Sequence, residues 1–327
     1  MSQSIYIATR GSALALAQSN MVLAQCRAHF SNRAFELKII KTTGDKLQTL
    51  NLTNPNQTVT KGLFTKELEV ALINKEADFA VHSLKDLPTE LPEGLYLSAV
   101  SEREDVRDVL LYRDRTSARE KRGLAPNAQI TDFPASATIA TSSTRRQAQL
   151  LAIRPDLKTV PIRGNVGTRI KKLHEKPELD GIILALAGLK RLGYKITPEG
   201  KIEGKDVPEG LLATILPIDQ MLPCVGQAAL GFESRIGDKQ TDAICARLND
   251  LPTFHCVTAE RAFLQAMGGG CLSPVAAHAQ VIQNQLRISA VSFRDGKLRR
   301  TENIGPFDSA FELGRAAARA VGSPHCQ

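Results

Sequence analysis

Cys271 occupies an unusual place in this 327-residue sequence, directly after three glycines at 268–270 and just before Leu272. Glycine-rich backbone carries little bulk and has wide conformational freedom, so a large group can approach the thiol closely. This position favours a covalent attachment to the Cys271 sulfur. The alternative is a small buried hydrophobic residue beside a helix stop. For Cys271 considered alone, the buried structural cysteine is the more common case, because free cysteine packs well and glycines end helices readily.

Arginines gather where predicted strands end and helices begin. The planar guanidinium fork binds a carboxylate at two points, and one such charge-assisted hydrogen bond contributes roughly 1.5–3 kcal/mol. Any single arginine is about as well explained by an internal salt bridge. The set favours a bound anion, since cations in the first turn of a helix oppose its dipole unless an anion compensates them. The arginines are Arg10, Arg145, Arg146, Arg163, Arg169 and Arg191, accompanied by the hydroxyl residues Ser12, Thr141 and Ser143.

A hydroxyl, an ammonium and a carboxylate stand within four residues at Ser83, Lys85 and Asp86, after a strand predicted at 77–81. Asp86 could act as a general acid or base, or as the counter-ion of a developing cation, and a positioned acid or base contributes roughly 10²–10⁴-fold in rate. The structural alternative is that Asp86 caps a turn before Pro88. The arginines favour the catalytic interpretation, because a carboxylate among anion-binding groups must serve something other than attraction.

The elements that must hold these residues form two similar halves. The triplet Ile-Ala-Thr occurs at 7–9 and again at 139–141, each time at the end of a predicted strand and before a helix. Two further strand pairs follow in the same order, 37–40 with 157–160 and 77–81 with 179–183. The pattern predicts two related α/β lobes, each a mainly parallel sheet with helices on both faces. Ligands of such sheets bind at the carboxyl ends of the strands.

The last part of the chain has a different pattern. A helix at 259–266, alternating strands at 275–281 and 286–290, and a hairpin turn at Asp295-Gly296 predict a small α+β domain with Cys271 in its first loop. Ser309 and Glu312 match a capping box for a final helix. We expect lobe one to comprise residues 1–104 with 214–246, lobe two residues 105–213, and the C-terminal domain residues 250–327.

Composition limits the class of partner. Lysine and arginine number 42 against 34 acidic residues, and the net charge of +8 favours an anion. With no tryptophan and 5% aromatic residues, a small polyanion fits better than nucleic acid. The cysteines lack metal-ligand spacing, which predicts reduced thiols and no metal. The longest strongly apolar run, 182–187, is too short to span a bilayer, and the first residues show no leader pattern. We expect a soluble cytoplasmic monomer without a membrane partner.

Several short motifs follow one another over nearly the whole chain. They include Ile-Ala-Thr-Arg-Gly-Ser at 7–12, Lys-Gly-Leu-Phe at 61–64, Val-His-Ser-Leu-Lys-Asp at 81–86, Arg-Gly-Asn-Val-Gly-Thr-Arg at 163–169 and Gly-Gly-Cys at 269–271. Each motif alone is weak evidence, but the ordered series is specific. In this order the motifs resemble the porphobilinogen deaminase family, also called the hydroxymethylbilane synthases.

The resemblance implies a three-domain transferase whose two lobes look like periplasmic binding proteins and whose Cys271 holds a dipyrromethane cofactor through a thioether. In the family, porphobilinogen loses ammonia to give an azafulvenium-type cation that joins the growing chain. After four cycles, hydrolysis releases the linear tetrapyrrole of haem and porphyrin biosynthesis. The main alternative is a non-catalytic two-lobed receptor for a small polycarboxylate, which explains the arginines and leaves Cys271 idle.

Residue roles follow from the same resemblance. Asp86 matches the catalytic carboxylate, and Lys61 matches a basic residue of a lid loop. This chain departs from the family pattern at 51–60, which lacks the usual glycine-rich, lysine-bearing form, and at Ala140 and Ala228, where glycine is expected. The side chains implied to bind cofactor and substrate carboxylates are Arg10, Ser12, Ser83, Lys85, Thr141, Ser143, Arg145, Arg146, Arg163, Arg169 and Arg191.

Overall fold

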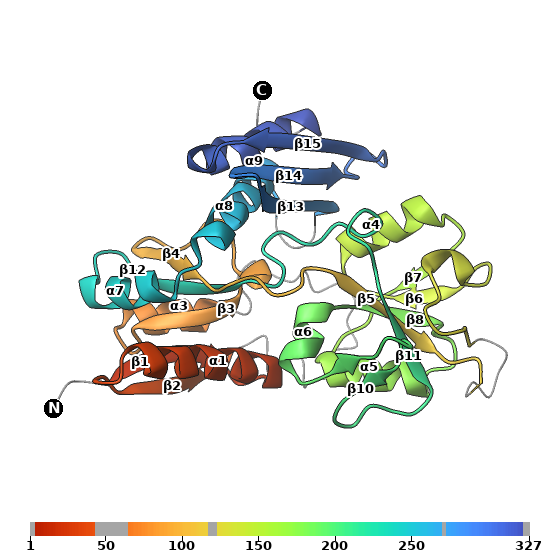
Figure 1. Ribbon diagram of the computed structural model, residues 1–327, viewed down its shortest axis with the longest axis horizontal. Helices are drawn as coiled ribbons and strands as arrows, with labels where there is room; N and C mark the ends of the chain where they lie inside the picture. Colours follow the sequence, from red (N-terminus) through yellow and green to blue (C-terminus); the bar gives the residue numbers. More distant parts are fainter. Residues whose placement is uncertain (1–3, 43–64, 117–122, 270–272, 323–327) are drawn as a thin grey trace.

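The chain folds into two α/β lobes that lie side by side, with a smaller third domain above their junction (Figure 1). The computed structural model describes residues 4–42, 65–116, 123–269 and 273–322. Within these ranges, no helix combines the length and the apolar character needed to cross a membrane. The predicted class, two α/β lobes plus a small α+β domain, is confirmed.

Lobe one is built on a five-stranded sheet in the order β2-β1-β3-β12-β4. Strand β1 is parallel to β2 and β3, whereas β12 is antiparallel to both β3 and β4. Helices α1 and α7 cover one face and α3 the other, so apolar side chains are buried on both sides of the sheet. The bounds are β1 Ile5–Arg10, α1 Ala13–His29, β2 Phe35–Ile40, α3 Lys66–Ile73, β3 Phe79–Ser83, β4 Leu95–Val100, β12 Leu230–Arg235 and α7 Lys239–Leu248.

Lobe two has a sheet in the order β11-β5-β8-β6-β7. Strand β6 is parallel to β7 and β8, and β5 is antiparallel to β8 and β11. Helices α5 and α6 pack on one face and α4 on the other. The bounds are β5 Asp108–Arg113, β6 Thr138–Ala140, α4 Thr144–Ile153, β7 Lys158–Val160, α5 Val166–Glu175, β8 Gly181–Ala185, α6 Leu186–Arg191, β9 Lys195–Ile196, β10 Ile202–Glu203 and β11 Leu211–Ile215.

The two sheets repeat each other strand for strand. Strands β2, β1 and β3 of lobe one correspond to β7, β6 and β8 of lobe two, and in both sheets the fourth position holds an antiparallel strand. That strand is β12 in lobe one and β5 in lobe two. Each follows a stretch of chain that passes between the lobes, which we name the first crossing segment (101–107) and the second crossing segment (216–229). Strand β11 belongs to the second sheet, so the boundary expected between residues 213 and 214 falls inside it.

The C-terminal domain is a three-stranded antiparallel meander with two helices packed on it (Figure 1). Its elements are α8 Leu251–Ala266, β13 Val275–Ile282, β14 Gln285–Ser292, β15 Arg299–Gly305 and α9 Ala310–Ala320. Helix α8 begins eight residues before the predicted start because Asp250 accepts a hydrogen bond from the Thr253 N–H at 2.9 Å. Ser309 precedes α9 without a capping hydrogen bond from its side chain, so the predicted capping box is wrong.

Candidate active site between the two lobes

Side chains from both lobes meet at the carboxyl ends of their parallel strands. Lys85 follows β3 of lobe one, and the charges of Arg146 and Asp108 in lobe two reach its ammonium group. Arg169 belongs to α5 of lobe two, and the charge of Asp86 in lobe one reaches its guanidinium. The sequence-based expectation placed these groups at one edge of each sheet, and the fold turns the two edges toward each other.

The lobe-one side of the cleft is a small pocket of about 60 Å³, to which Arg10 and Asp86 both contribute. Ser12 lies at the N-terminus of α1, where its Oγ accepts a hydrogen bond from the Ala15 N–H at 3.3 Å. Ser83 is hydrogen-bonded to Gln18 of α1 at 2.9 Å, which fixes the end of β3 against that helix.

Asp86 lies at the end of a short 3₁₀ turn, Leu84–Asp86, and its side chain is exposed to solvent. The neighbouring Lys85 is half-buried, and burial lowers the pKa of its ammonium group. Arg146 lowers that pKa further, whereas Asp86 and Asp108 oppose the shift. The two residues therefore offer the cleft a hydrated carboxylate beside a poorly hydrated cation.

The lobe-two side is built around the first turn of α4. Thr141 Oγ1 accepts a hydrogen bond from the Ser143 N–H at 3.2 Å, which shapes the turn between β6 and α4. Ser143 is the N-cap residue, yet its hydroxyl makes no capping bond. Arg145 and Arg146 follow in the helix, and both are buried, at 4% and 7% exposure.

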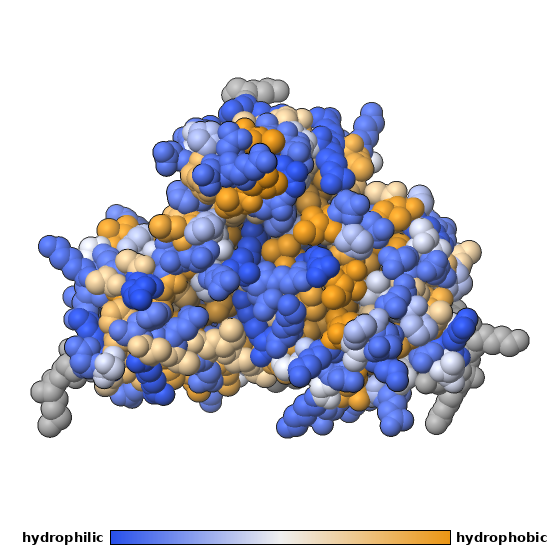
Figure 2. Space-filling view, in the orientation of Figure 1, coloured by the Kyte–Doolittle hydropathy of each residue, from blue (hydrophilic) through white to orange (hydrophobic). Residues whose placement is uncertain are grey.

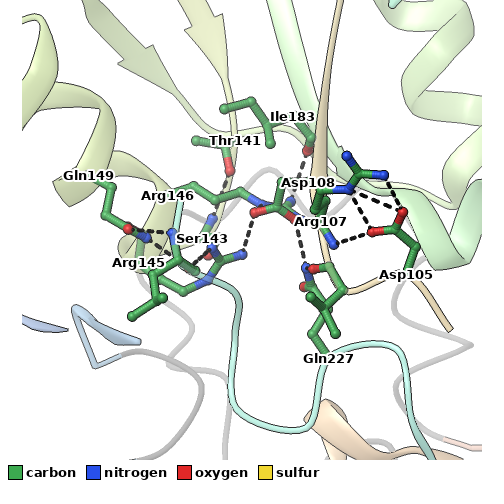
Figure 3. A network of polar contacts seen from close by, with 12 residues as sticks. Asp105, Arg107, Asp108, Thr141, Ser143, Arg145, Arg146, Gln149, Ile183 and Gln227 are labelled. Carbon is green, nitrogen blue, oxygen red and sulfur yellow. Dashed lines mark hydrogen bonds and ion pairs between the residues drawn. The ribbon is translucent and has the colours of Figure 1, made fainter. Parts of the chain in front are cut away.

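Asp108, at the start of β5, holds both of these arginines (Figure 3). Arg145 Nη2 lies 2.8 Å from Asp108 Oδ2, and Arg146 binds the carboxylate with Nη2 at 2.8 Å and Nε at 3.1 Å. Burial alone would raise the pKa of Asp108, but the two arginines, with hydrogen bonds from Arg146 and Gln227, hold it well below its usual value. The compensating anion that the helix-dipole argument requires is therefore supplied, in part, by this chain.

Sequence reasoning missed Asp108. One signal could have found it: an aspartate opens the strand 108–112, whose other residues are Val, Leu, Leu and Tyr. A carboxylate in a strand buried on both faces must have cationic partners. Two arginines side by side in a helix that covers the same sheet are the natural candidates for that role.

The other three predicted arginines lie in different surroundings. Arg169 Nε donates to the Gly164 carbonyl at 2.7 Å, which closes the loop before α5, and burial lowers the pKa of its guanidinium. Arg191 Nη2 donates to the carbonyl of Ala228 in the second crossing segment at 2.5 Å. Arg163 is exposed and lines a separate pocket with Lys172 and Lys176. The structure thus groups Arg169 with the cleft residues and places Arg163 beside a second basic surface.

Cys271 and Lys61 lie outside the described residues, but the ends of the Cys271 loop are described. A methyl group added to Gly269 would lie 2.7 Å from Ser273 Oγ, so the two ends of the loop lie against each other just beyond α8. The glycine at 269 is what permits this approach. The described residues on either side of Cys271 are therefore close together at the end of α8.

Helix α8 is fixed to both crossing segments through one buried carboxylate, Glu260. Arg103 of the first crossing segment binds it with Nη1 at 2.6 Å and Nη2 at 3.0 Å. The N–H groups of Gly226 and Ala279 each donate to it at 2.8 Å. The domain that contains Cys271 is thus held by polar contacts to the same chain segments that connect the lobes.

Chemically, the described part of the cleft combines largely buried cations with one exposed carboxylate. In the space-filling view, hydrophilic residues gather between the two lobes, below the third domain (Figure 2). Arg145, Arg146 and Lys85 bring three positive charges and Asp108 one negative charge, so the buried groups carry an excess of cations. Such a donor set suits a ligand with several carboxylates. Asp86 is the group that could meet a cationic or N–H-bearing part of the same ligand.

Known proteins match this chain along nearly its full length. A family model described as "Porphobilinogen deaminase, dipyromethane cofactor binding domain" matches residues 5–243, and one described as "Porphobilinogen deaminase, C-terminal domain" matches residues 254–321. Curated relatives named porphobilinogen deaminase include that of Geobacter sulfurreducens, 43% identical over 317 residues that cover 96% of this chain and 90% of the relative. That of Syntrophomonas wolfei is 42% identical over 322 residues, 98% of this chain and 95% of the relative.

Solved structures found by fold comparison include the BenM effector binding domain with benzoate, at a TM-score of 0.41 and 11% identity, covering 74% of this chain and 88% of that one. The periplasmic aliphatic sulphonate binding protein SsuA from Escherichia coli has a TM-score of 0.39 and 10% identity, covering 82% and 71%. The family models and the close relatives decide the identity. This chain belongs to the porphobilinogen deaminase family.

Proposed function

We propose that this chain is a hydroxymethylbilane synthase. It joins four porphobilinogen molecules head to tail, with loss of ammonia, on a primer held by Cys271, and then releases the linear tetrapyrrole by hydrolysis. One observation carries the proposal beyond family membership: cations from both lobes converge on a cleft that also holds one exposed carboxylate, Asp86. A chain of pyrroles, each with an acetate and a propionate arm, has the complementary chemistry.

The donor set fits a dipyrromethane as the resident cofactor. Arg145 is buried, and its Nε has no hydrogen-bond partner among the described residues. A buried guanidinium N–H without an acceptor is unfavourable, and a ligand carboxylate would satisfy it. When bound through the Cys271 sulfur, the cofactor supplies a free pyrrole carbon as the nucleophile. The remaining chemistry is the task of the side chains.

We assign the catalytic role to Asp86. Departure of ammonia from porphobilinogen leaves positive charge spread over the substrate's methylene carbon and pyrrole nitrogen. A carboxylate that accepts the pyrrole N–H stabilises that charge most strongly in the transition state. Lys85 and Arg169, whose charges interact with this carboxylate, hold the substrate side arms. The same binding role is proposed for Arg10, Ser12, Ser83, Thr141, Ser143, Arg145, Arg146, Arg163 and Arg191, and for Lys61 from the lid.

We also propose that the protein acts as a cytoplasmic monomer on a small-molecule substrate, with no nucleic-acid or membrane partner. Two observations support the absence of a nucleic-acid partner. The chain has few aromatic residues on which bases could stack, and the cationic groups described above surround a cleft instead of forming an extended groove. The proposed domains are residues 1–104 with 214–246, residues 105–213 and residues 250–327, except that residues 214 and 215 belong with lobe two because they complete β11.

Intact-protein mass spectrometry tests the function directly. Protein from a porphobilinogen-producing host should be heavier than its chain by one dipyrromethane, and added porphobilinogen should give further discrete mass steps. Cys271→Ser should lose the added mass and all turnover, whereas the matched control Cys224→Ser, a half-buried thiol near Lys85, should keep the added mass. A pure receptor would behave differently: Cys271→Ser would keep its affinity for the polycarboxylate, and the unaltered chain would carry no added mass.

A further inference from the structure

We propose that Asp108 is a positioning residue for the anion site. Its carboxylate fixes the guanidiniums of Arg145 and Arg146, and the cluster of these three side chains keeps one positive charge, matched to one ligand carboxylate, apart from the charge of Lys85. The inference rests on the proposed function for the identity of that ligand. Its geometric part concerns only side chains of this chain and can be tested separately.

All the acceptor positions of the Asp108 carboxylate are in use (Figure 3). Oδ1 accepts from Arg146 Nη2 at 2.8 Å and from Gln227 Nε2 at 2.9 Å. Oδ2 accepts from Arg145 Nη2 at 2.8 Å and from Arg146 Nε at 3.1 Å. A carboxylate offers about four lone pairs, so this one has none left for a substrate or a proton transfer. Asp108 therefore acts on the reaction through the arginines that it holds.

The charge count of the cluster is two guanidiniums against one carboxylate, with Asp108 fully buried. An uncompensated charge in such surroundings is costly until an anion arrives. Without Asp108 the two guanidiniums would carry two uncompensated positive charges, and no single carboxylate would bind both of them. With it, Arg146 is held by the carboxylate on one edge and by the Ile183 carbonyl, which accepts from Nη1 at 2.8 Å. The orientation of that guanidinium is thus set before any ligand binds.

Asp108 also links the arginines to both crossing segments. It is the first residue of β5, directly after the first crossing segment. Gln227, in the second crossing segment, donates from its amide to both Asp108 and the Val106 carbonyl, the latter at 2.7 Å. Arg145 Nη1 donates to the Leu222 carbonyl of the same segment at 2.8 Å. A buried ion pair adds little to stability compared with apolar packing, so its distinctive contribution here is a fixed geometry.

The test compares Asp108→Asn with Asp156→Asn. Asp156 is paired with Arg154 just after the same helix α4 through two 2.7 Å contacts, but that pair is at the surface. In crystal structures, Asp108→Asn should displace the guanidiniums of Arg145 or Arg146 by more than about 0.5 Å, the tolerance of a preorganised site. The rate per cofactor-bearing molecule should fall about 100-fold, with a smaller change in KM. Asp156→Asn should leave the rate and both guanidiniums unchanged.

A charge-balanced variant makes the test independent of a folding defect. Asp108→Asn combined with Arg145→Gln restores the single positive charge of the cluster, so it should melt at a higher temperature than Asp108→Asn alone. Unmoved guanidiniums, a rate of Asp108→Asn within threefold of the unaltered chain, or a double variant that melts no higher than Asp108→Asn would each overturn the proposal. So would failure of both variants to fold. An unaltered chain without deaminase activity would instead refute the proposed function, and the crystallographic comparison would still decide the geometric part.

Discussion

Asp86 and Asp108 are both aspartates at the cleft, and their surroundings suit them to the two different roles proposed for them. Asp108 is fully buried and saturated with donors, whereas Asp86 is exposed at the end of a turn. Replacing Asp86 with Asn keeps the shape and removes the charge, so turnover should fall by about 10²–10³-fold while the cofactor stays attached. Single-turnover rates on protein verified by mass measure this. Asp295→Asn, in an exposed hairpin turn, serves as the control, and near-normal turnover of Asp86→Asn would contradict the assignment.

The buried His278, on β13, should make the free energy of unfolding depend on pH. Burial lowers the pKa of His278 to about 4, with Glu260 opposing this shift and Arg103 and Arg287 adding to it. An unfolded histidine titrates near 6.5, so between pH 6.5 and 4 the unfolded chain binds a proton that the folded chain does not. His278 should therefore cost stability as the pH falls through this window, by up to about 3 kcal/mol at pH 4.

The measurement is urea unfolding of the unaltered chain and of His278→Gln at several pH values. The variant should lose less stability than the unaltered chain between pH 6.5 and 4. His174→Gln, at an exposed position of α5, should follow the unaltered chain. Parallel curves for the unaltered chain and His278→Gln would show that the folded imidazole takes up a proton as readily as the unfolded one, which would contradict the lowered pKa.

The residue-level predictions from sequence had one systematic gap. The spacing of residues identified arginines at helix starts and their unfavourable interaction with the helix dipole. It did not identify Asp108, the partner of Arg145 and Arg146, which lies 37 and 38 residues earlier on strand β5. Such pairing depends on which strands become neighbours. The role of each arginine toward a ligand, and of Asp86, stays a prediction.

At the scale of elements, the contact between α8 and α9 depends on a missing side chain. A methyl group on Gly314 of α9 would overlap the carbonyl oxygen of Ala259 in α8. Gly314→Ala should therefore force the helices apart and destabilise the protein by about 1–3 kcal/mol or more, despite the better helix propensity of alanine. The matched control is Gly188→Ala in α6, whose methyl group would meet Leu14 at an ordinary 3.8 Å. Thermal unfolding of both variants decides the point, and equal melting temperatures would refute it.

Repetition in the sequence predicted the element pattern well. The Ile-Ala-Thr triplets fall on β1 and on the end of β6, and the strands expected after them appear as β2, β7, β3 and β8. What sequence could not supply was the antiparallel strand of each sheet, because β12 and β5 reach their sheets from the other side of a crossing segment. The predicted capping box at Ser309 is wrong for a local reason. A 3₁₀ turn, Phe307–Ser309, directly precedes α9, and the Ser309 side chain makes no capping hydrogen bond.

At the scale of the whole molecule, the buried pair of Arg103 and Glu260 is one of the contacts that join the C-terminal domain to the rest. Glu260 is fully buried, so Arg103→Leu would leave a buried carboxylate without its cation and should cost about 3–5 kcal/mol. Denaturant unfolding measures the loss. Arg299→Leu removes an exposed partner of Asp295 and should cost less than about 1 kcal/mol. Similar losses in the two variants would show that the buried pair does not secure the domain.

The last strand of the lobe-one sheet, β12, follows the whole of lobe two in the sequence, and this order has a consequence for synthesis on the ribosome. Among the strands that the structure describes, those of lobe two are all present once β11 emerges, whereas β4 of lobe one pairs only with β12, which begins at Leu230. The N-terminal half must therefore wait, with the edge of β3 unpaired, while more than a hundred further residues are translated. Until β12 has been translated, the nascent chain therefore carries an open edge at β3 that is exposed to mispairing with other strands.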